Sequence, residues 1–450
     1  MDERMKILNS GEVMDKSLVV YWMQASQRVE YNHALAYAIK RANELEKPLV
    51  VYFGITENFP EANARHYFFM LQGLKEVKED LKSRNIKMLI RKISPEKGAL
   101  ELSDISSLMI TYRGYLRIER EWRNYLAQNA GCQVVQIESN VVVPVEEVSD
   151  KEEYSAATIR RKIQKKTEAY IEKIVIEKVK INSLDISLPY DEIDISDINE
   201  CINDLKINSA VSESRFYNGG YISAKLMLKD FIENKLEEYS THPDNDYSSG
   251  LSPYLHFGQI SPIEIIIELE NIKAEKKDDF LEELIVRREL SFNFVFYNKN
   301  YDEISCIPAW ARKTLEEHKA DIRDYTYTLN ELEQANTHDE YWNAAQREMT
   351  VSGKMNSYMR MYWGKKLIEW MESYEDAYNV AIYLNNKYCI DGRDPNSFAG
   401  IAWCFGKHDR PWGERQIFGK IRYMNSKGLD RKFNMMTYVE RIKGQTDSSL

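Results

Sequence analysis

Short apolar runs alternate with longer amphipathic stretches through the first 150 residues of the chain. The apolar runs, rich in β-branched residues, occupy 17–23, 48–53, 86–91, 108–112 and 132–138. Helical spacing of apolar residues occupies about 30–45, 65–84 and 117–129. Continuous apolar strands separated by helices are typical of a parallel sheet that is covered on both faces. The pattern therefore predicts a doubly wound α/β domain, which we place at residues 1–181.

The strand pattern almost vanishes in the second half of the chain. Helical spacing runs from about 213 to 450, interrupted by short turns at 218–220, 391–395 and 410–413. Between the halves, residues 182–206 carry seven acidic residues against one lysine and show little periodicity. These features predict an acidic linker at 182–212 and an all-helical domain at 213–450. A basic helix at 155–180 is expected just before the linker.

Composition excludes several classes of protein. The 450-residue chain has five cysteines and no CxxC pair, which argues against a disulfide framework, a zinc ribbon or an iron–sulfur cluster. It also lacks GxGxxG and GxxxxGK[ST], so no classical dinucleotide or P-loop site is expected. No apolar run approaches about 18 residues and the N-terminus is charged, so we expect a cytoplasmic protein without a membrane span or a metal site.

Charge is distributed unevenly along the chain. The net charge is −10, yet residues 405–450 carry ten Lys or Arg against five acidic residues. A locally basic surface can bind phosphates on an acidic protein, because the local field steers the ligand. The alternative for this segment is an ordinary solvated surface of mixed charge. The high aromatic content, 12%, suits stacking against flat rings as well as packing in a helical core.

Three segments of the helical half carry candidate chemistry. The first, 248–258, is a loop of small hydroxyl residues that leads into a helix and suits a phosphate; a simple helix cap is the alternative. The second, 353–371, reads as one helix that places Arg360 on the same stripe as Trp363 and Trp370. A buried arginine needs an anionic partner, which Asp391 or Asp394 could supply. The two tryptophans could pass an electron or form a plain core seam.

The third segment combines polar residues and tight turns at 385–396, followed by 400–403. Packing alone does not explain this density of polar residues between helices. The segment therefore predicts the floor of a pocket, with an ordinary polar turn between helices as the alternative.

Several long motifs in order carry a resemblance to one family. They include SSGLSPYLHFGQIS, LEELIVRREL, THDEYWNAAQ, GKMNSYMRMYWGKK, LNNKYCIDGRDPN, GIAW and HDRPWGER. Together they resemble class II cyclobutane pyrimidine dimer photolyases over nearly the whole chain. The resemblance implies an α/β antenna domain and a helical domain that binds FAD. It implies light-driven splitting of pyrimidine dimers in UV-damaged duplex DNA by a monomeric carbon–carbon lyase. An antenna chromophore such as 8-hydroxy-5-deazaflavin is an option that no residue identifies.

The resemblance also implies roles for residues around the flavin. The phosphate loop would consist of Ser248, Ser249, Gly250, Leu251 and Ser252. An ion pair between Arg360 and Asp391 would lie beside the flavin ring, with Gly392 and Asp394 in the same turn. Asn385 would face flavin N5, where a neutral amide favours repair over signalling. Trp363, Trp342 and Trp370 would form the relay through which a photo-oxidised flavin is re-reduced.

Other matched positions concern the lesion. Glu283 would hydrogen-bond the carbonyls of the dimer and stabilise its radical anion. Trp403 and Met361 would contact the extruded bases, and Arg422 would enter the gap that the bases leave in the duplex. The chain departs from the family at 239–243, which reads YSTHP where relatives often carry an Arg-Asn-rich stretch. It also has Arg287 where some relatives have tryptophan.

Four other functions remain in view. A cryptochrome-like photoreceptor would share FAD and the relay, but Asn385 and Glu283 favour repair. A (6-4) photoproduct photolyase is the nearest enzyme alternative, although no histidine stands where that chemistry requires one. A flavin oxidoreductase would need a hydride-donor site. A DNA-binding module without chemistry would not need the Arg360/Asp391 pair.

Overall fold

The N-terminal half folds around one six-stranded sheet in the computed structural model, which describes residues 2–447. The strands are β1 (Met5–Ile7), β2 (Leu18–Trp22), β3 (Leu49–Ile55), β4 (Lys87–Lys92), β5 (Ser106–Tyr112) and β6 (Gln133–Ile137). Their order is β1-β6-β5-β2-β3-β4, and every pairing is parallel except that of β1 with β6. The pattern missed β1, because three largely exposed residues at a sheet edge leave no apolar run to detect.

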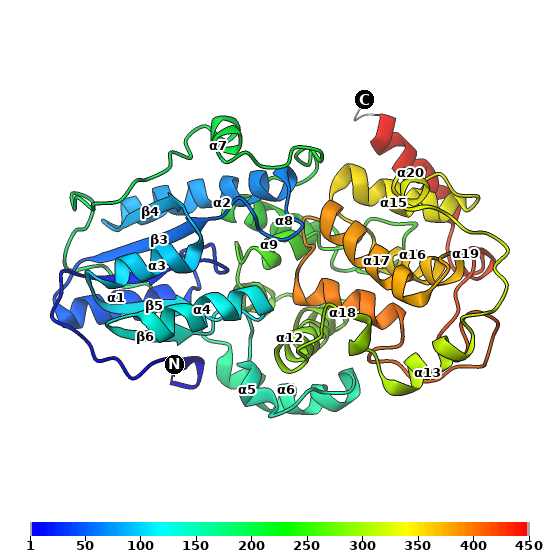
Figure 1. Ribbon diagram of the computed structural model, residues 1–450, viewed down its shortest axis with the longest axis horizontal. Helices are drawn as coiled ribbons and strands as arrows, with labels where there is room; N and C mark the ends of the chain where they lie inside the picture. The colour runs from blue at the N-terminus through cyan, green and yellow to red at the C-terminus, as the bar shows by residue number, and fades with distance from the viewer. Residues whose placement is uncertain (1, 448–450) are drawn as a thin grey trace.

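Helices cover both faces of this sheet, to the left in Figure 1. Val19 and Tyr21 of β2 point to the face covered by α1 (His33–Leu45) and α2 (Ala64–Ser83). The alternate residues, Val20 and Trp22, point to the face covered by α3 (Pro95–Ser103) and α4 (Arg117–Asn129). Both sets are buried, which is why the strand reads as a continuous apolar run rather than an alternating one.

The rest of the described chain is helical. The 3₁₀ turn Asp2–Arg4 precedes β1, and α5 (Val145–Val148) and α6 (Ala156–Tyr170) follow the sheet. The remaining helices are α7 (Ile198–Asp204), α8 (Tyr221–Asn234), α9 (Ser252–His256), α10 (Pro262–Leu269), α11 (Lys277–Leu281), a π-helical segment (Glu282–Arg287), α12 (Arg288–Tyr297), a 3₁₀ turn (Ile304–Cys306), α13 (Ala309–Glu317), α14 (Leu329–Glu333), α15 (Glu340–Ser352), α16 (Ser357–Trp370), α17 (Tyr374–Tyr388), α18 (Pro395–Cys404), α19 (Ser426–Asp430) and α20 (Met435–Asp447).

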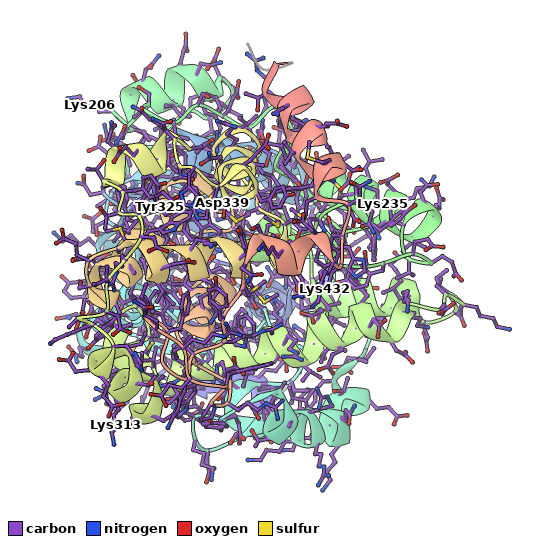
Figure 2. All side chains as sticks on the ribbon, turned by 90° about the vertical axis from the view of Figure 1, so that its right-hand side faces the viewer. Lys206, Lys235, Lys313, Tyr325, Asp339 and Lys432 are labelled. Atoms are coloured by element: carbon purple, nitrogen blue, oxygen red, sulfur yellow. The ribbon has the colours of Figure 1, made fainter. Side chains whose placement is uncertain are left out.

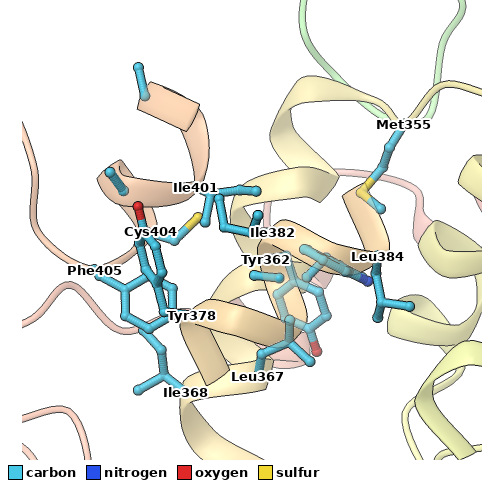
Figure 3. Close-up of a cluster of buried hydrophobic side chains, with 14 of the residues drawn as sticks. Met355, Tyr362, Leu367, Ile368, Tyr378, Ile382, Leu384, Ile401, Cys404 and Phe405 are labelled. Atoms are coloured by element: carbon cyan, nitrogen blue, oxygen red, sulfur yellow. The ribbon is translucent and has the colours of Figure 1, made fainter. Parts of the chain in front are cut away.

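Helices α16, α17 and α18 form the centre of the helical core. Figure 3 shows Tyr362 and Leu367 of α16 beside Tyr378 of α17, with Cys404 and Phe405 closing the cluster from the end of α18. Figure 2 looks onto this half, and its labelled surface residues include Lys313 of α13 and Lys432 before α20. The predicted fold class, a doubly wound α/β domain followed by a helical domain, is confirmed.

Two predicted helices differ from the structure. The helix predicted over 353–371 begins four residues later, at Ser357: α15 ends at Ser352, and the φ of +83° at the next residue, Gly353, is the left-handed conformation that glycine tolerates. Asn356 then caps α16, and its side-chain oxygen accepts from the backbone N–H groups of Tyr358 and Met359. The basic helix is also shorter than predicted, since α6 ends at Tyr170.

The acidic segment contains one regular element, α7. Cys201, Ile202 and Leu205 on this helix are buried with the core that α2 forms against the sheet. The boundaries of the linker and of the two domains stay a prediction. Within residues 2–447, no helix is both long and apolar enough to span a membrane.

Candidate functional site

An open cavity of about 340 Å³ lies in the helical half. Its walls come from the loop before α9, the π-helical segment, the start of α16 and the turn that leads into α18. The lining residues that bear on function are Tyr239, Thr241, Ser249, Ser252, His256, Phe280, Glu283, Leu284, Arg288, Lys354, Arg360, Met361, Asp391, Asp394, Asn396, Ser397 and Trp403. Its size is ordinary for a pocket that binds a small molecule or cofactor.

Arg360 and Asp391 meet on one wall of the cavity. Arg360 Nη2 lies 3.5 Å from Asp391 Oδ1, and both side chains are largely buried. Burial, the largest single influence, lowers the pKa of the guanidinium, but the charge and hydrogen bond of Asp391 together with the nearby Cys389 and Cys404 thiols raise that pKa overall. The buried Nε atom of Arg360 has no hydrogen-bond partner among the described residues. The pair therefore presents a fixed cation with an unused donor, which suits a polar ring or an anion.

The hydroxyl loop borders two adjoining spaces. Ser249 and Ser252 line the main cavity, whereas Ser248 and Gly250 line a neighbouring polar pocket, and Lys354 borders both. Ser252 Oγ is buried and makes no hydrogen bond within the described residues, and no side chain caps α9. The helix-cap interpretation is therefore wrong for this serine. Leu251 is buried in the core instead of facing either space.

Asp394 supports the opposite side of the turn. Its Oδ2 lies 3.1 Å from His256 Nδ1, and Oδ1 accepts from the backbone of Asn396 at 2.8 Å. Burial would raise the pKa of this carboxyl, but the His256 hydrogen bond and the nearby Arg288 charge outweigh it and lower that pKa. The sequence motifs predict no role for His256 or Arg288, because only the folded chain brings these residues to the turn.

Asn385 lies behind the cavity wall. It is buried on α17, and its Nδ2 donates to Ser397 Oγ at 3.1 Å, while Ser397 lines the cavity. Gly392 holds the turn close to α17, since an added Cβ would come within 2.9 Å of Asn386 Cα and Cys389 O. Both residues thus shape the wall, and Asn385 reaches the cavity only past Ser397.

The two neighbouring glutamates of the π-helical segment point to different surroundings. Glu282 forms an ion pair with Arg160 of α6 at 2.6 Å and lies 3.5 Å from Arg287. Glu283 lines the cavity and is open to its solvent. Partial desolvation, aided by the Glu282 charge, raises the pKa of Glu283 despite the opposing charge of Arg287. The structure therefore identifies Glu283 as the one available to a ligand, which sequence spacing alone did not decide.

Aromatic and cationic side chains stack at another part of the cavity. Met361 and Trp403 line it. The Arg422 guanidinium lies over the rings of both Trp403 and Trp412, at 5.7 and 5.2 Å. On Trp403, the buried Lys365 ammonium lies 5.6 Å from the ring centroid. Trp412 is 41% exposed and extends this stack to the surface. The sequence motifs predict no role for it.

The three tryptophans form a continuous row of buried indoles. Trp342 of α15 stacks on Trp363 with centroids 6.2 Å apart and contacts Trp370 at 5.4 Å. The Trp363 Nε1 donates to Gln346 Oε1 at 2.9 Å. All three are at most 1% exposed, and Trp370 contacts the exposed His338 at 5.5 Å. The row thus ends one ring short of the surface.

A second cavity, of about 120 Å³, lies beside the carboxyl ends of β2 and β3. Its walls include Gln24, Phe53, Thr56, Tyr67 and Trp122 from the α/β half and His256 and Arg393 from the helical half. In doubly wound sheets, ligands bind at this edge.

The comparisons with known proteins agree with this architecture. Residues 19–178 match the DNA photolyase family profile. A deoxyribodipyrimidine photo-lyase of Methanothermobacter thermautotrophicus is 49% identical to the chain over 449 residues, with 99% of each chain covered. This chain belongs to the DNA photolyase family. The prediction of a photo-lyase is confirmed at this level.

A more distant relative and two solved structures are also similar to this chain. The deoxyribodipyrimidine photo-lyase of Potorous tridactylus is 37% identical, covering 94% of this chain and 81% of its own. A photolyase structure from Sulfolobus tokodaii with two FAD molecules has a TM-score of 0.72 at 14% identity, covering 94% of this chain and 89% of its own. A Synechocystis cryptochrome has a TM-score of 0.75 at 14% identity, with 95% and 89% covered. These structures share the fold with this photolyase-family chain.

Proposed function

We propose that this protein is a class II photolyase that uses FAD and light to split cyclobutane pyrimidine dimers in duplex DNA. The observation that carries the proposal is one cavity lined by two chemically different sets of residues. We assign the Arg360–Asp391 pair and the hydroxyl loop to a first, cofactor side, and Glu283, Met361 and Trp403 to a second, lesion side. Such a cavity suits a cofactor and a pyrimidine dimer held against each other, and the 49% identical relative is named for this activity.

The residues of the first side fit FAD. Ser252 Oγ and Arg360 Nε are buried polar atoms without partners in the described chain, and a pyrophosphate or a flavin edge would satisfy them. Ser248, Ser249 and Gly250 would hold the phosphates across the two adjoining spaces, with Lys354 between them. Asp394 and Gly392 would fix the turn, and Asn385 would act through Ser397. When bound and reduced, FAD supplies an excitable one-electron donor.

The residues of the second side would receive the lesion. A flipped base is read by hydrogen bonds to its Watson–Crick edge and by stacking on apolar and aromatic side chains. Glu283 would provide the hydrogen bond, and Met361 and Trp403 would provide the apolar contact. Arg422, held over Trp403 and Trp412, would enter the space that the extruded bases leave. Burial in a water-poor cavity would strengthen these contacts when charge develops on the dimer.

The indole row would serve a separate purpose. Trp363, Trp342 and Trp370 would carry electrons inward to restore the reduced cofactor, while repair itself returns its electron and needs no net reductant. The close contacts of 6.2 and 5.4 Å between rings support this role.

The second cavity would hold an antenna chromophore such as 8-hydroxy-5-deazaflavin. Flat aromatic walls from Phe53 and Trp122, at the strand edge where such folds bind ligands, support this role. The test is the absorption spectrum of the protein mixed with the deazaflavin, compared with the variant Phe53→Trp, which fills the cavity.

The decisive experiment uses the reduced, FAD-loaded protein and a duplex that contains one thymine dimer. Illumination near 400 nm should restore thymine absorbance, whereas a dark control should not. A protein that binds FAD and the duplex but restores nothing would instead be a cryptochrome-like photoreceptor. Repair of a (6-4) photoproduct duplex and not of the dimer would reassign the substrate. Full-length protein that fails to bind FAD would refute the assignment.

A further inference from the structure

The segment 239–243 borders the main cavity. Tyr239 and Thr241 line it, although the family motif at this place is absent from the chain. The segment is held from outside: Arg441 of α20 donates to the carbonyl oxygens of Pro243 and Asn245 at 2.9 and 3.2 Å. The backbone of the cavity wall is thus fixed, and Tyr239 is its largest side chain.

Two edge-to-face contacts orient the Tyr239 ring. Phe231 of α8 lies 5.7 Å from it at 84°, and Phe280 of α11 lies 5.4 Å from it at 83°. Contacts from two helices leave the ring little freedom to turn. No hydrogen bond among residues 2–447 involves the Tyr239 hydroxyl, and it is not one of the fully buried polar atoms, so it is free to bind a ligand. The ring is fixed and its donor is unused.

The Tyr239 phenol lies in the field of Glu283. Burial, followed by the charges of Glu283 and of Asp279 on α11, raises the pKa of the phenol. The hydroxyl therefore keeps its proton at every pH near neutrality. The cavity thus holds a permanent donor and a carboxylate acceptor on neighbouring elements.

We propose that Tyr239 is a specificity-determining residue that donates a hydrogen bond to a carbonyl oxygen of the extruded pyrimidine dimer. The inference rests on the proposed function and deepens it. Each thymine of the dimer presents two carbonyl acceptors and one N3–H donor, whereas a carboxyl group donates at most one hydrogen bond, and only when it is protonated. Glu283 can therefore donate to one carbonyl oxygen at most, and Tyr239 supplies a donor for another.

The same hydrogen bond acts on the chemical step. The dimer gains one electron, its cyclobutane bonds break, and the electron leaves again; Tyr239 keeps its proton throughout. While the electron resides on the dimer, negative charge lies on the carbonyl oxygen, and a hydrogen bond to a charged acceptor is about twice as strong as a neutral one. Tyr239 therefore stabilises the reduced dimer more than the neutral one.

The test compares Tyr239→Phe, which removes only the hydroxyl, with the matched control Tyr125→Phe on the exposed surface of α4. FAD-loaded protein is titrated in the dark with a duplex that contains one thymine dimer and with the same duplex undamaged. We expect Tyr239→Phe to lose about five-fold in affinity for the dimer duplex and nothing for the undamaged duplex. The number of dimers split per absorbed photon at saturating DNA should fall as well.

Three outcomes would overturn the inference. They are equal dimer affinity in Tyr239→Phe and Tyr125→Phe, an equal loss on both duplexes, or a loss accompanied by a lower melting temperature and FAD content. In each case the wild type still repairs dimers and the proposed function stands. If the wild type itself repairs nothing, the proposed function fails first. A double-mutant cycle with Glu283→Gln should show non-additive losses, because both side chains hold the same base.

Discussion

The indole planes of Trp342 and Trp363 lie 8° from parallel, with their centroids 6.2 Å apart, and the two residues come from different helices. A hydrogen bond from Trp342 Nε1 to the carbonyl oxygen of Trp363, at 3.1 Å, fixes this arrangement. The two rings are buried outside the cavity lining, so their proposed role in electron transfer can be tested separately from ligand binding.

Replacing Trp363 by Phe should abolish photoreduction of the oxidised cofactor and leave repair by pre-reduced protein largely intact. In the proposed mechanism the relay needs the indole, whereas repair returns its own electron. Flash spectroscopy measures the first property and dimer repair measures the second.

The change leaves Gln346 Oε1 without its donor, which should cost about 1–3 kcal/mol of stability. Trp22→Phe is the matched control, because Trp22 is equally buried and its indole donates to Gln24 at 3.0 Å. Loss of repair in Trp363→Phe alone, at similar stability, would mean that Trp363 has a structural role in the cavity.

Replacing Ser252 by Ala should change cofactor binding and stability in opposite directions. The buried Oγ has no partner in the described chain, so its removal should raise the free energy of unfolding of the FAD-free protein by up to about 1 kcal/mol. FAD affinity should fall about five-fold, since a phosphate contact is lost. Chemical denaturation and flavin titration measure the two effects; unchanged FAD affinity would exclude Ser252 from the phosphate site.

Replacing Asp391 by Ala should destabilise the protein by about 3 kcal/mol, because it leaves the Arg360 cation buried without its partner. Glu192→Ala is the control: it breaks a surface pair with Lys78 and should cost less than about 1 kcal/mol. Similar melting temperatures for the two variants would show that Arg360 finds another anion.

Lys365 gives a pH-dependent prediction. Burial is the main cause that lowers the pKa of its ammonium to about 8. The folded state therefore releases this proton more readily than the unfolded state, in which the lysine pKa is about 10.4. The cost of burying the charge is complete below pH 8 and is relieved as the pH rises from about 8 toward 10.

The variant Lys365→Met lacks this dependence. The unfolding free energy of the wild type, measured relative to that of the variant by urea denaturation, should rise between pH 7 and pH 10. A constant difference across this range would mean that Lys365 stays charged in the folded protein, held by its contact with the Cys404 carbonyl.

Local sequence patterns were enough to predict five of the six strands, β2 to β6, and the helical character of the second half. Buried parallel strands must be apolar on both faces, so runs such as that of β2 can be recognised from the sequence alone. The motifs that carry the family resemblance are local too: the hydroxyl loop, Arg360 and the turn at Asp391 are each continuous segments. Short strands at a sheet edge carry no apolar run, and β1 was missed for that reason.

Which of these segments meet follows from tertiary packing. The helix predicted over 353–371 starts only at Ser357, because the left-handed conformation at Gly353 separates α15 from α16 and brings Lys354 between two pockets. The choice between Asp391 and Asp394 as the partner of Arg360 was likewise open, and the fold pairs Arg360 with Asp391 and gives Asp394 to His256. Pairings of this kind depend on the packing of residues far apart in sequence, which no local pattern records.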